Sequence, residues 1–221
     1  MKRYSLSSIF TEAFRDNLGW EKAWTKRQPK KEYQIIIVGG GGHGLATAYY
    51  LAKNFNITDI AVIEKGWIGG GNTGRNTTII RSNYLQESSI GIYEKSRFLY
   101  ETLSQDLNYN IMFSPRGVLM LCQTEHELRA MKRTSHANRI NGVDTKMVAP
   151  EEVKEIVPII NINGPRFPVL GALWQPRGGT ARHDAVAWGY ARKCSDFGID
   201  SIEQCEVIGV QKKREKIVGV E

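Results

Sequence analysis

Cysteine and long hydrophobic runs are both scarce in this chain of 221 residues. The three cysteines, Cys122, Cys194 and Cys205, are widely spaced and form neither a CxxC pair nor a cysteine–histidine cluster. Neither a disulfide framework nor a metal site is therefore expected, and the thiols are predicted to be buried. No stretch approaches the ~20 apolar residues of a membrane-spanning helix, and Met1–Tyr4 starts without the apolar core of a signal peptide. We therefore expect a cytoplasmic protein without a membrane segment.

Long runs of like charge are also absent. The formal net charge of +7 would suit nucleic acid if the basic residues were concentrated. The two basic runs, Lys26–Lys31 and Lys212–Arg214, are short, and each is interpreted as solvated surface. No nucleic-acid partner is expected. The proportions of hydrophobic (41%) and charged (24%) residues predict a globular fold rather than disorder.

Strand and helix patterns alternate along the chain, which predicts an α/β fold. An arm of residues 1–31 with a short helix near Ile9–Leu18 precedes a domain of residues 32–221. The predicted strands cover residues 33–38, 60–64, 117–121, 169–174 and 201–210, with 216–221 as the hairpin partner of the last. One predicted helix follows the glycines after residue 38. The others cover residues 87–105 and 125–140, a short segment opened by Pro150, and residues 184–197.

The sequence Gly39-Gly40-Gly41-Gly42-His43-Gly44 carries a GxGxxG pattern between a predicted strand and a predicted helix. Gly39 permits the tight turn, Gly41 lets the backbone approach a diphosphate, and Gly44 lets the helix pack closely on the sheet. The helix start adds N–H groups and partial positive charge. Glu64, twenty residues past Gly44 at the end of the second strand, is expected to accept hydrogen bonds from ribose hydroxyls. Together these features predict a dinucleotide site.

This fingerprint is shared by FAD and NAD sites, so it does not choose between them. A second loop, Gly69–Thr78, is rich in glycine, hydroxyl and amide groups and follows the second strand directly. Such a loop suits a cofactor whose diphosphate and ring system are wrapped along the sheet edge, which favours FAD. An ordinary surface loop of the same composition remains the alternative.

Three blocks carry a resemblance to a known family. They are Ile37–Tyr50 (IVGGGGHGLATAYY), Gly71–Tyr84 (GNTGRNTTIIRSNY) and Gly178–Trp188 (GGTARHDAVAW). In this order they closely resemble the β subunits of bacterial heterotetrameric sarcosine oxidases, over about residues 30–221. The β subunits of that family are nearly twice as long, so the chain matches their amino-terminal part.

The resemblance implies a glutathione-reductase-like FAD-binding domain with interleaved α+β substrate-domain segments, here with the C-terminal half missing. Residues 32–84 would form the βαβ core and residues 175–221 a second FAD-domain segment. The implied activity is oxidative demethylation of sarcosine to glycine by noncovalent FAD, with electrons passing to FMN and oxygen. Tetrahydrofolate would capture the one-carbon unit, NAD would sit on a partner subunit, and the other oxidase subunits would be partners.

The resemblance also assigns site residues. The residues expected at the FAD are Gly39, Gly41, Gly42, His43, Gly44, Leu45, Glu64, Lys65, Asn72, Thr73, Arg75, Thr77, Ile79 and Val207. His183 matches the histidine that holds FMN covalently, and neutral imidazole is a competent nucleophile. Arg177 and Arg182 are candidates for the FMN phosphate. Taken alone, a histidine just before a helix is more often a capping or packing residue.

Other residues are left open. His43 either packs in the glycine loop or lines the flavin site, whereas His126 and His136 are expected to be solvated. Val207 either presents strand backbone to the adenine or serves in structural packing alone. Arg81 and Arg75 suit either a flavin or substrate carboxylate, or a surface salt bridge. No catalytic base is assigned.

Two other functions fit the same sequence. One is another FAD-dependent oxidase or dehydrogenase of secondary or tertiary amines, such as dimethylglycine. The other is a nucleotide-binding scaffold without turnover. Flavin content separates the first from the main hypothesis, and flavin reduction by sarcosine separates the second.

Overall fold

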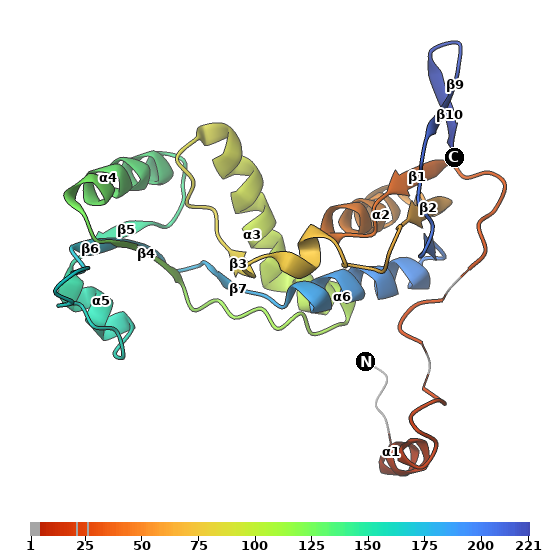
Figure 1. The fold of residues 1–221 in the computed structure, drawn as a ribbon, viewed down its shortest axis with the longest axis horizontal. Coiled ribbons are helices and arrows are strands. Elements are labelled where there is room, and N and C mark those ends of the chain that lie inside the picture. Colours follow the sequence, from red (N-terminus) through yellow and green to blue (C-terminus); the bar gives the residue numbers. More distant parts are fainter. Residues whose placement is uncertain (1–4, 21, 26) are drawn as a thin grey trace. The chain divides into compact units, whose positions relative to one another are not determined.

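The computed structural model describes residues 5–20, 22–25 and 27–221 (Figure 1). By the contacts within the chain it divides into two compact units. The first unit comprises Met1–Asn76, Gln105–Ile111 and His183–Glu221, and the second comprises Thr77–Ser104 and Met112–Arg182. The domain boundaries drawn from the sequence at residues 31, 84 and 175 stay predictions.

A three-stranded parallel sheet is the centre of the first unit. It contains β1 (Ile35–Val38), β2 (Ile60–Ile63) and β8 (Asp200–Ile202), in the order β1-β2-β8. Ile35 is in register with Ile60, and Ala61 with Asp200. The central strand β2 is fully buried, as its uninterrupted apolar sequence requires. The predicted βαβ unit is confirmed.

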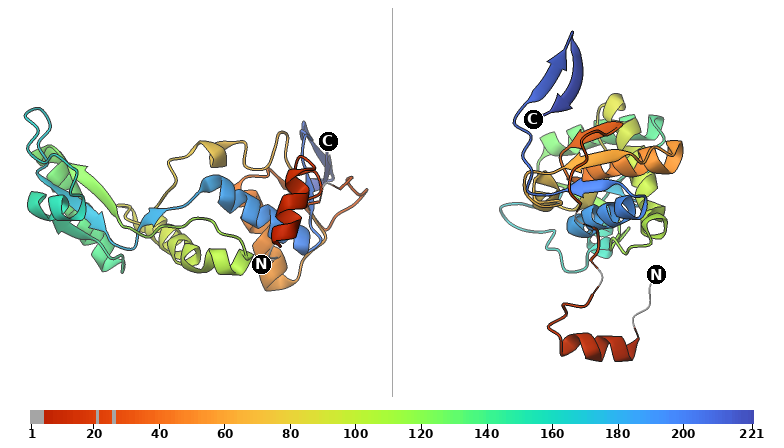
Figure 2. Two further views of the ribbon diagram at one scale, coloured as in Figure 1. Left: turned by 90° about the horizontal axis from the view of Figure 1, so that it is seen from below. Right: turned by 90° about the vertical axis from the view of Figure 1, so that its right-hand side faces the viewer.

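Two helices of the first unit, α2 (Gly42–Phe55) and α6 (His183–Asp196), pack against each other (Figure 2). α2 turns Leu45 and three other buried apolar residues inward at helical spacing, and α6 contributes buried Cys194, whose Sγ lies 3.6 Å from the Leu45 carbonyl oxygen. Burial raises the pKa of the Cys194 thiol to about 12. Cys122 is also buried, as expected, whereas Cys205 is half-buried.

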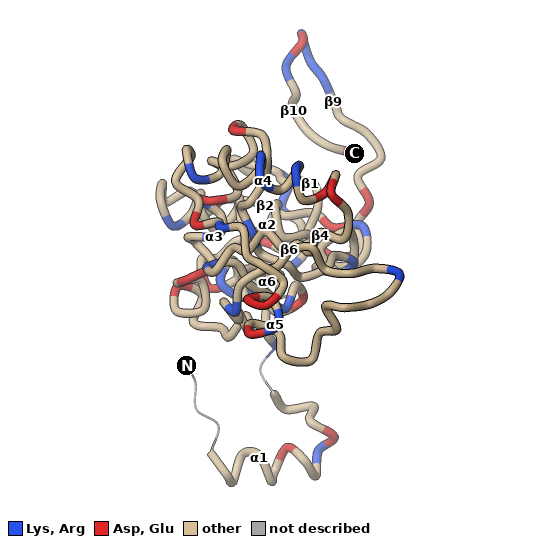
Figure 3. The backbone as a smooth tube through the Cα atoms, turned by 90° about the vertical axis from the view of Figure 1, so that its left-hand side faces the viewer, with Lys and Arg blue, Asp and Glu red and all other residues tan. Residues whose placement is uncertain are grey.

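The single strand predicted over residues 201–210 is wrong. β8 ends at Ile202, and the chain leaves the sheet because Gln204 takes a left-handed conformation (φ 59°) and its amide donates to the Gly66 carbonyl. A separate antiparallel hairpin follows, made of β9 (Val210–Lys213) and β10 (Lys216–Val220) (Figure 2). Figure 3 shows basic and acidic residues together at its tip, which agrees with the predicted solvated run.

The N-terminal arm carries the predicted short helix, α1 (Leu6–Ala13). The Ser5 side chain caps it by accepting a hydrogen bond from the Ser8 amide at 3.1 Å. The helix stops before Leu18 because Asp16 and Asn17 take left-handed conformations.

The second unit contains a three-stranded antiparallel sheet between two helices. The sheet has the order β4-β6-β5, and α4 and α5 lie on opposite sides of it (Figure 1). The bounds are β4 (Val118–Cys122), α4 (Glu125–Ile140), β5 (Lys146–Val148), α5 (Pro150–Ile156) and β6 (Gly171–Gln175). α4 starts with a capping box between Thr124 and Glu127, and α5 starts at Pro150 as predicted.

Two short strands, one near the first residue of this unit and one near its last, pair with each other. β3 (Ile79–Ile80) pairs antiparallel with β7 (Gly179–Thr180). The long helix α3 (Glu87–Leu107) starts in this unit and extends to residues that belong to the first. In the part of the chain that the structure describes, no helix combines the length and apolar character needed to cross a bilayer.

A buried arginine fastens α3 within the second unit. The Arg97 side chain is only 1% exposed, yet it is charged and pairs with both Glu94 and Glu101, one turn away on either side. Glu94 also accepts from the Ser82 hydroxyl, and Glu101 accepts from Arg177 at 2.9 Å. The cluster therefore joins α3 to the segments that follow β3 and β6.

We expect Arg97→Met to lower the free energy of unfolding of the full-length protein by about 2 kcal/mol at neutral pH, because Glu94 loses its ion pair and Glu101 keeps only Arg177. The hydrogen bonds from Arg97 hold the pKa values of Glu94 and Glu101 below their usual 4.5. This contribution is present above pH 4.5 and is lost as the pH falls through the lowered pKa values. The loss measured by urea unfolding should therefore shrink in acid. An equal loss for the exposed control Arg133→Met, or at all pH values, would contradict this role.

Candidate functional site

The glycine-rich turn between β1 and α2 has the geometry that its sequence predicts. Gly39 takes φ 110°, a conformation that side chains disfavour, and its amide donates to the Ile63 carbonyl at 2.7 Å. A Cβ on Gly44 would lie 2.0 Å from the Gly39 carbonyl oxygen, so only glycine fits where the helix meets the strand. The predicted roles of Gly39 in the turn and of Gly44 in close packing are confirmed. The turn directs the amino terminus of α2 at the carboxyl edge of the sheet.

Glu64 lies beside this helix start. Its Oε2 accepts from the Gly40 amide at 2.8 Å and its Oε1 from the Gly66 amide at 2.9 Å. The carboxylate therefore clamps the glycine turn to the end of β2. Two carboxylate oxygens offer about four acceptor positions, so capacity remains for ribose hydroxyls.

The second glycine-rich loop folds over the first. The Thr73 hydroxyl accepts from the Gly42 amide at 2.9 Å, and the Gly69 amide donates to the Gly40 carbonyl at 3.0 Å. A Cβ on Gly74 would lie 2.7 Å from the Gly69 carbonyl oxygen. These contacts hold the loop across the helix start.

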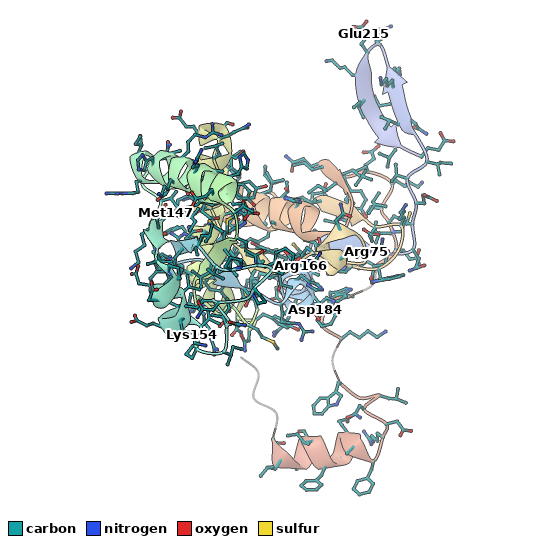
Figure 4. The ribbon with its side chains drawn as sticks, turned by 60° about the vertical axis from the view of Figure 1, so that its left-hand side comes forward. Arg75, Met147, Lys154, Arg166, Asp184 and Glu215 are labelled. Carbon is teal, nitrogen blue, oxygen red and sulfur yellow. The ribbon has the colours of Figure 1, made fainter. Side chains whose placement is uncertain are left out.

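The loop includes the 3-10 helix η1 (Asn72–Arg75), which packs against the start of α6 in the first unit. Figure 4 shows Arg75 on η1 and Asp184 on α6. Both Asn72 and Arg75 are exposed. Their side chains are free of the hydrophobic core, and their contact with FAD stays a prediction.

The structure brings some predicted FAD residues together and separates others. Gly39, Gly41, Gly42, Gly44, Glu64 and Thr73 gather at the start of α2. His43 is exposed there, and its role in packing or at the flavin stays a prediction. Leu45 is fully buried in the core, and Lys65 is exposed just after Glu64.

Three further predictions concern other parts of the chain. Val207 lies between β8 and β9 rather than in a strand, and it packs against the cluster of Ala61, Ile63 and Ile202, so its placement in a strand is wrong. Thr77 and Ile79 belong to the second unit. Contacts of these three residues with FAD stay predictions.

His183 is the first residue of α6, one position before the predicted start. Its Nδ1 atom is buried and has no hydrogen-bond partner among the described residues. At the same helix end, the Ala185 amide is held by the Asp184 carboxylate at 2.8 Å. A buried imidazole nitrogen without a partner fits a residue that acquires a covalent or hydrogen-bonded group.

The two arginines predicted near the FMN phosphate differ. The Arg177 guanidinium already pairs with Glu101, and its amide donates to Asp144 at 2.9 Å. Arg182 is exposed immediately before His183. Binding of the phosphate by either residue stays a prediction.

Arg81, in the second unit, is held in a defined orientation. Its guanidinium stacks on Tyr84 at 4.2 Å, and Tyr84 stacks on Tyr93 with ring centroids 4.2 Å apart. Its Nη1 donates to Asn83 Oδ1 at 2.8 Å and approaches the Met120 sulfur. These acceptors carry no charge, so the positive charge of Arg81 is not neutralised by them.

Sequence reasoning missed several residues that build these sites. Gly40 packs where a Cβ would lie 2.9 Å from Glu64 and Ile68, and its amide holds the Glu64 carboxylate. Glu203 directly follows β8, and its carboxylate accepts a hydrogen bond from the Ile68 amide, just before the second glycine-rich loop. Gly40 is visible in the sequence as the second glycine of the run Gly39–Gly42, whereas no local pattern marks Glu203.

Comparison with known proteins agrees with this geometry. The model of the "FAD dependent oxidoreductase" family matches residues 34–221. The chain belongs to the FAD-dependent oxidoreductase family. The predicted α/β fold class is thereby confirmed, and the match starts just before β1 and contains both glycine-rich loops.

Two relatives of this family member are named sarcosine oxidase subunit beta. The one from Rhodobacter capsulatus is 64% identical over 221 residues, which is 100% of this chain and 53% of the relative. The one from Rhizobium meliloti is 51% identical over 219 residues, 99% of this chain and 53% of the relative. The resemblance stated from the three sequence blocks is confirmed. The chain spans about half the length of the curated relatives it matches.

A solved structure shares the fold. The L-proline dehydrogenase from P. horikoshii matches with a TM-score of 0.79 and 32% identity, over 87% of this chain and 49% of that one. FAD dependence is a property of the family whose model matches this chain. Binding of the cofactor by the glycine turn and Glu64 stays a prediction.

Proposed function

We propose that this chain is the amino-terminal part of a sarcosine oxidase β subunit, in which FAD oxidises the N-methyl group of sarcosine. The observation that carries this proposal is the clamp of the glycine turn by Glu64 and Thr73 in a chain similar over its whole length to such subunits. FAD bound there would accept two electrons and a proton, as a hydride equivalent, from the amine. The residues of this chain would bind the FAD and orient the substrate against it.

The FAD would be held by three groups of the first unit. The start of α2 would face the diphosphate with its partial positive charge and with the N–H groups that remain beside the Gly42 amide, which donates to Thr73. The Glu64 carboxylate would accept hydrogen bonds from the ribose hydroxyls, and the loop around Thr73 would cover the cofactor. Asn72, Arg75, Thr77 and Ile79 would extend that contact toward the flavin.

Arg81 would bind the sarcosine carboxylate. Its stacking on Tyr84 and its bond to Asn83 fix the plane of the guanidinium before substrate arrives, so little side-chain freedom is lost on binding. Several of its five N–H donors remain for a carboxylate. By holding the carboxylate, the fixed guanidinium of Arg81 would give the N-methyl group of bound sarcosine one defined position.

The remaining parts of the assembly are proposed on the same basis. His183 would hold FMN covalently, supported by its buried and unpartnered Nδ1. FMN would pass electrons to oxygen. Companion subunits would carry NAD, and tetrahydrofolate would take the one-carbon unit.

The test uses the full-length subunit assembled with its companions, mixed with sarcosine without oxygen. We expect sarcosine to bleach the flavin absorption, and Arg81→Met to raise KM for sarcosine at least tenfold with unchanged flavin content. The exposed Arg133→Met serves as control. Reduction by dimethylglycine but not by sarcosine would favour the other amine oxidase. A flavin that neither amine reduces would favour a scaffold.

A further inference from the structure

The N-terminal arm exposes an unusual amount of apolar side chain. Phe14 and Leu18 are 89% and 85% exposed, and Leu6, Ile9 and Phe10 are also exposed. None of the described residues of α1 is buried. Contiguous exposed apolar residues of this size mark interaction sites in soluble proteins.

The apolar residues of α1 share one helix face. Leu6, Phe10 and Phe14 follow at intervals of four, and Ile9 lies at the intervening three-residue step. Figure 3 shows this helix almost free of charge, with one acidic position near its end. This is the i, i+3, i+4 spacing with which a short helix fills an apolar groove.

The polar side of the helix is engaged locally. The Glu12 carboxylate accepts from the Gly19 amide at 2.6 Å, and the Thr11 hydroxyl donates to the Ser7 carbonyl at 2.8 Å. The chain after α1 therefore folds back on the polar face. The apolar face is left as the accessible one.

The arm is anchored to the body of the first unit behind the helix. Trp24 Nε1 donates to Glu203 at 3.2 Å, Lys30 donates to Asp59 at 2.9 Å, and Arg27 lies 3.3 Å from the nearly buried carboxylate of Asp200. Tyr33 donates to the other oxygen of the same carboxylate. The connection to the unit is thus specific, whereas α1 itself makes no comparable contact in the described residues.

The arm is not a part of the family domain. The FAD-dependent oxidoreductase match starts at residue 34, after the whole arm. The match to the Rhodobacter sarcosine oxidase subunit covers all 221 residues and so includes it. A segment outside the redox domain, but shared with a chain named as a subunit, suits a role in assembly.

We infer that α1 and the turn to Leu18 dock in an apolar groove of a companion, non-identical subunit of the oxidase, an inference that rests on the proposed function. A membrane surface fits poorly, because interfacial helices carry Lys and Arg on their polar face and Leu6–Ala13 contains neither. The eight-residue helix is too short to be stable by itself, so a groove would also fix its conformation.

The test is a double substitution, Phe10→Ser with Phe14→Ser, in the full-length subunit co-purified with its companions. We expect the dissociation constant between this subunit and its companions to rise at least tenfold in native mass spectrometry and titration, with the FAD content of the subunit unchanged. Phe10→Leu with Phe14→Leu should restore assembly. The control is Phe55→Ser, which makes the same type of replacement once, at an exposed phenylalanine of α2.

The other outcomes are distinct. Unchanged assembly of the serine variant, or equal loss in Phe55→Ser, overturns the inference. A wild-type full-length subunit that buries this helix against its own carboxyl-terminal half, dimerises through it, or binds phosphatidylserine vesicles through it identifies a different occupant and also overturns the inference. If the wild-type complex assembles but sarcosine does not reduce its flavin, the proposed function fails while the docking result still stands.

Discussion

We expect the replacement of Gly41 by valine in the full-length protein to weaken FAD binding by at least 100-fold, below detection. Gly41 caps α2, and a Cβ there would already lie 3.1 Å from the Thr73 hydroxyl oxygen. The two further methyl groups of valine would fill the space through which a diphosphate reaches the helix start. FAD titration of the apoprotein, followed by flavin fluorescence, measures the effect.

The matched control is Gly91→Val on α3, where a Cβ meets open space. This variant should bind FAD as the wild type does. Normal FAD occupancy in Gly41→Val would show that the cofactor lies elsewhere, and equal loss in both variants would point to a general defect in folding.

If His183 holds flavin covalently, as proposed, we expect its replacement by alanine to remove the covalent flavin from the chain and to leave noncovalent FAD bound. The imidazole is at the start of α6, with Nδ1 buried and unpartnered among the described residues, and alanine offers no nucleophile. The measurement is acid denaturation of the full complex, followed by mass spectrometry of the peptide that contains residue 183.

The exposed His136→Ala on α4 is the control and should keep its covalent flavin. A wild-type complex that releases all its flavin in acid would refute covalent attachment. Retention of flavin on another peptide in His183→Ala would assign the bond to a different residue.

The glycine turn was predictable because its chemistry is local. Gly39 and Gly44 are fixed by steric limits between residues close in sequence, and Glu64 follows from the length of one strand–helix–strand unit. The long helices α3 and α4 were also predicted within two residues, because their apolar spacing and capping residues are contained in the segment itself.

The elements that were missed depend on distant residues. β3 and β7 contain two residues each and exist only through their pairing with each other, a hundred residues apart along the chain. The strand predicted over residues 201–210 breaks because Gln204 and Cys205 find carbonyl partners at Gly66 and Glu64. The prediction that Val207 lies in a strand fails because Val207 falls in the part of this segment that has left the sheet.

Charge was the least predictable feature. Nothing in the sequence around Arg97 indicates that its side chain is buried, because both glutamates one turn away are equally compatible with a solvated helix face. The stack of Arg81, Tyr84 and Tyr93 was likewise invisible, although Arg81 itself was singled out.

The most direct measurement is a structure of the full-length protein with FAD bound. The diphosphate should lie over Gly41 at the start of α2, with ribose hydroxyls on the carboxylate of Glu64. FAD bound away from the glycine turn, or a Glu64 side chain that makes no contact with the ribose, would contradict the central claim.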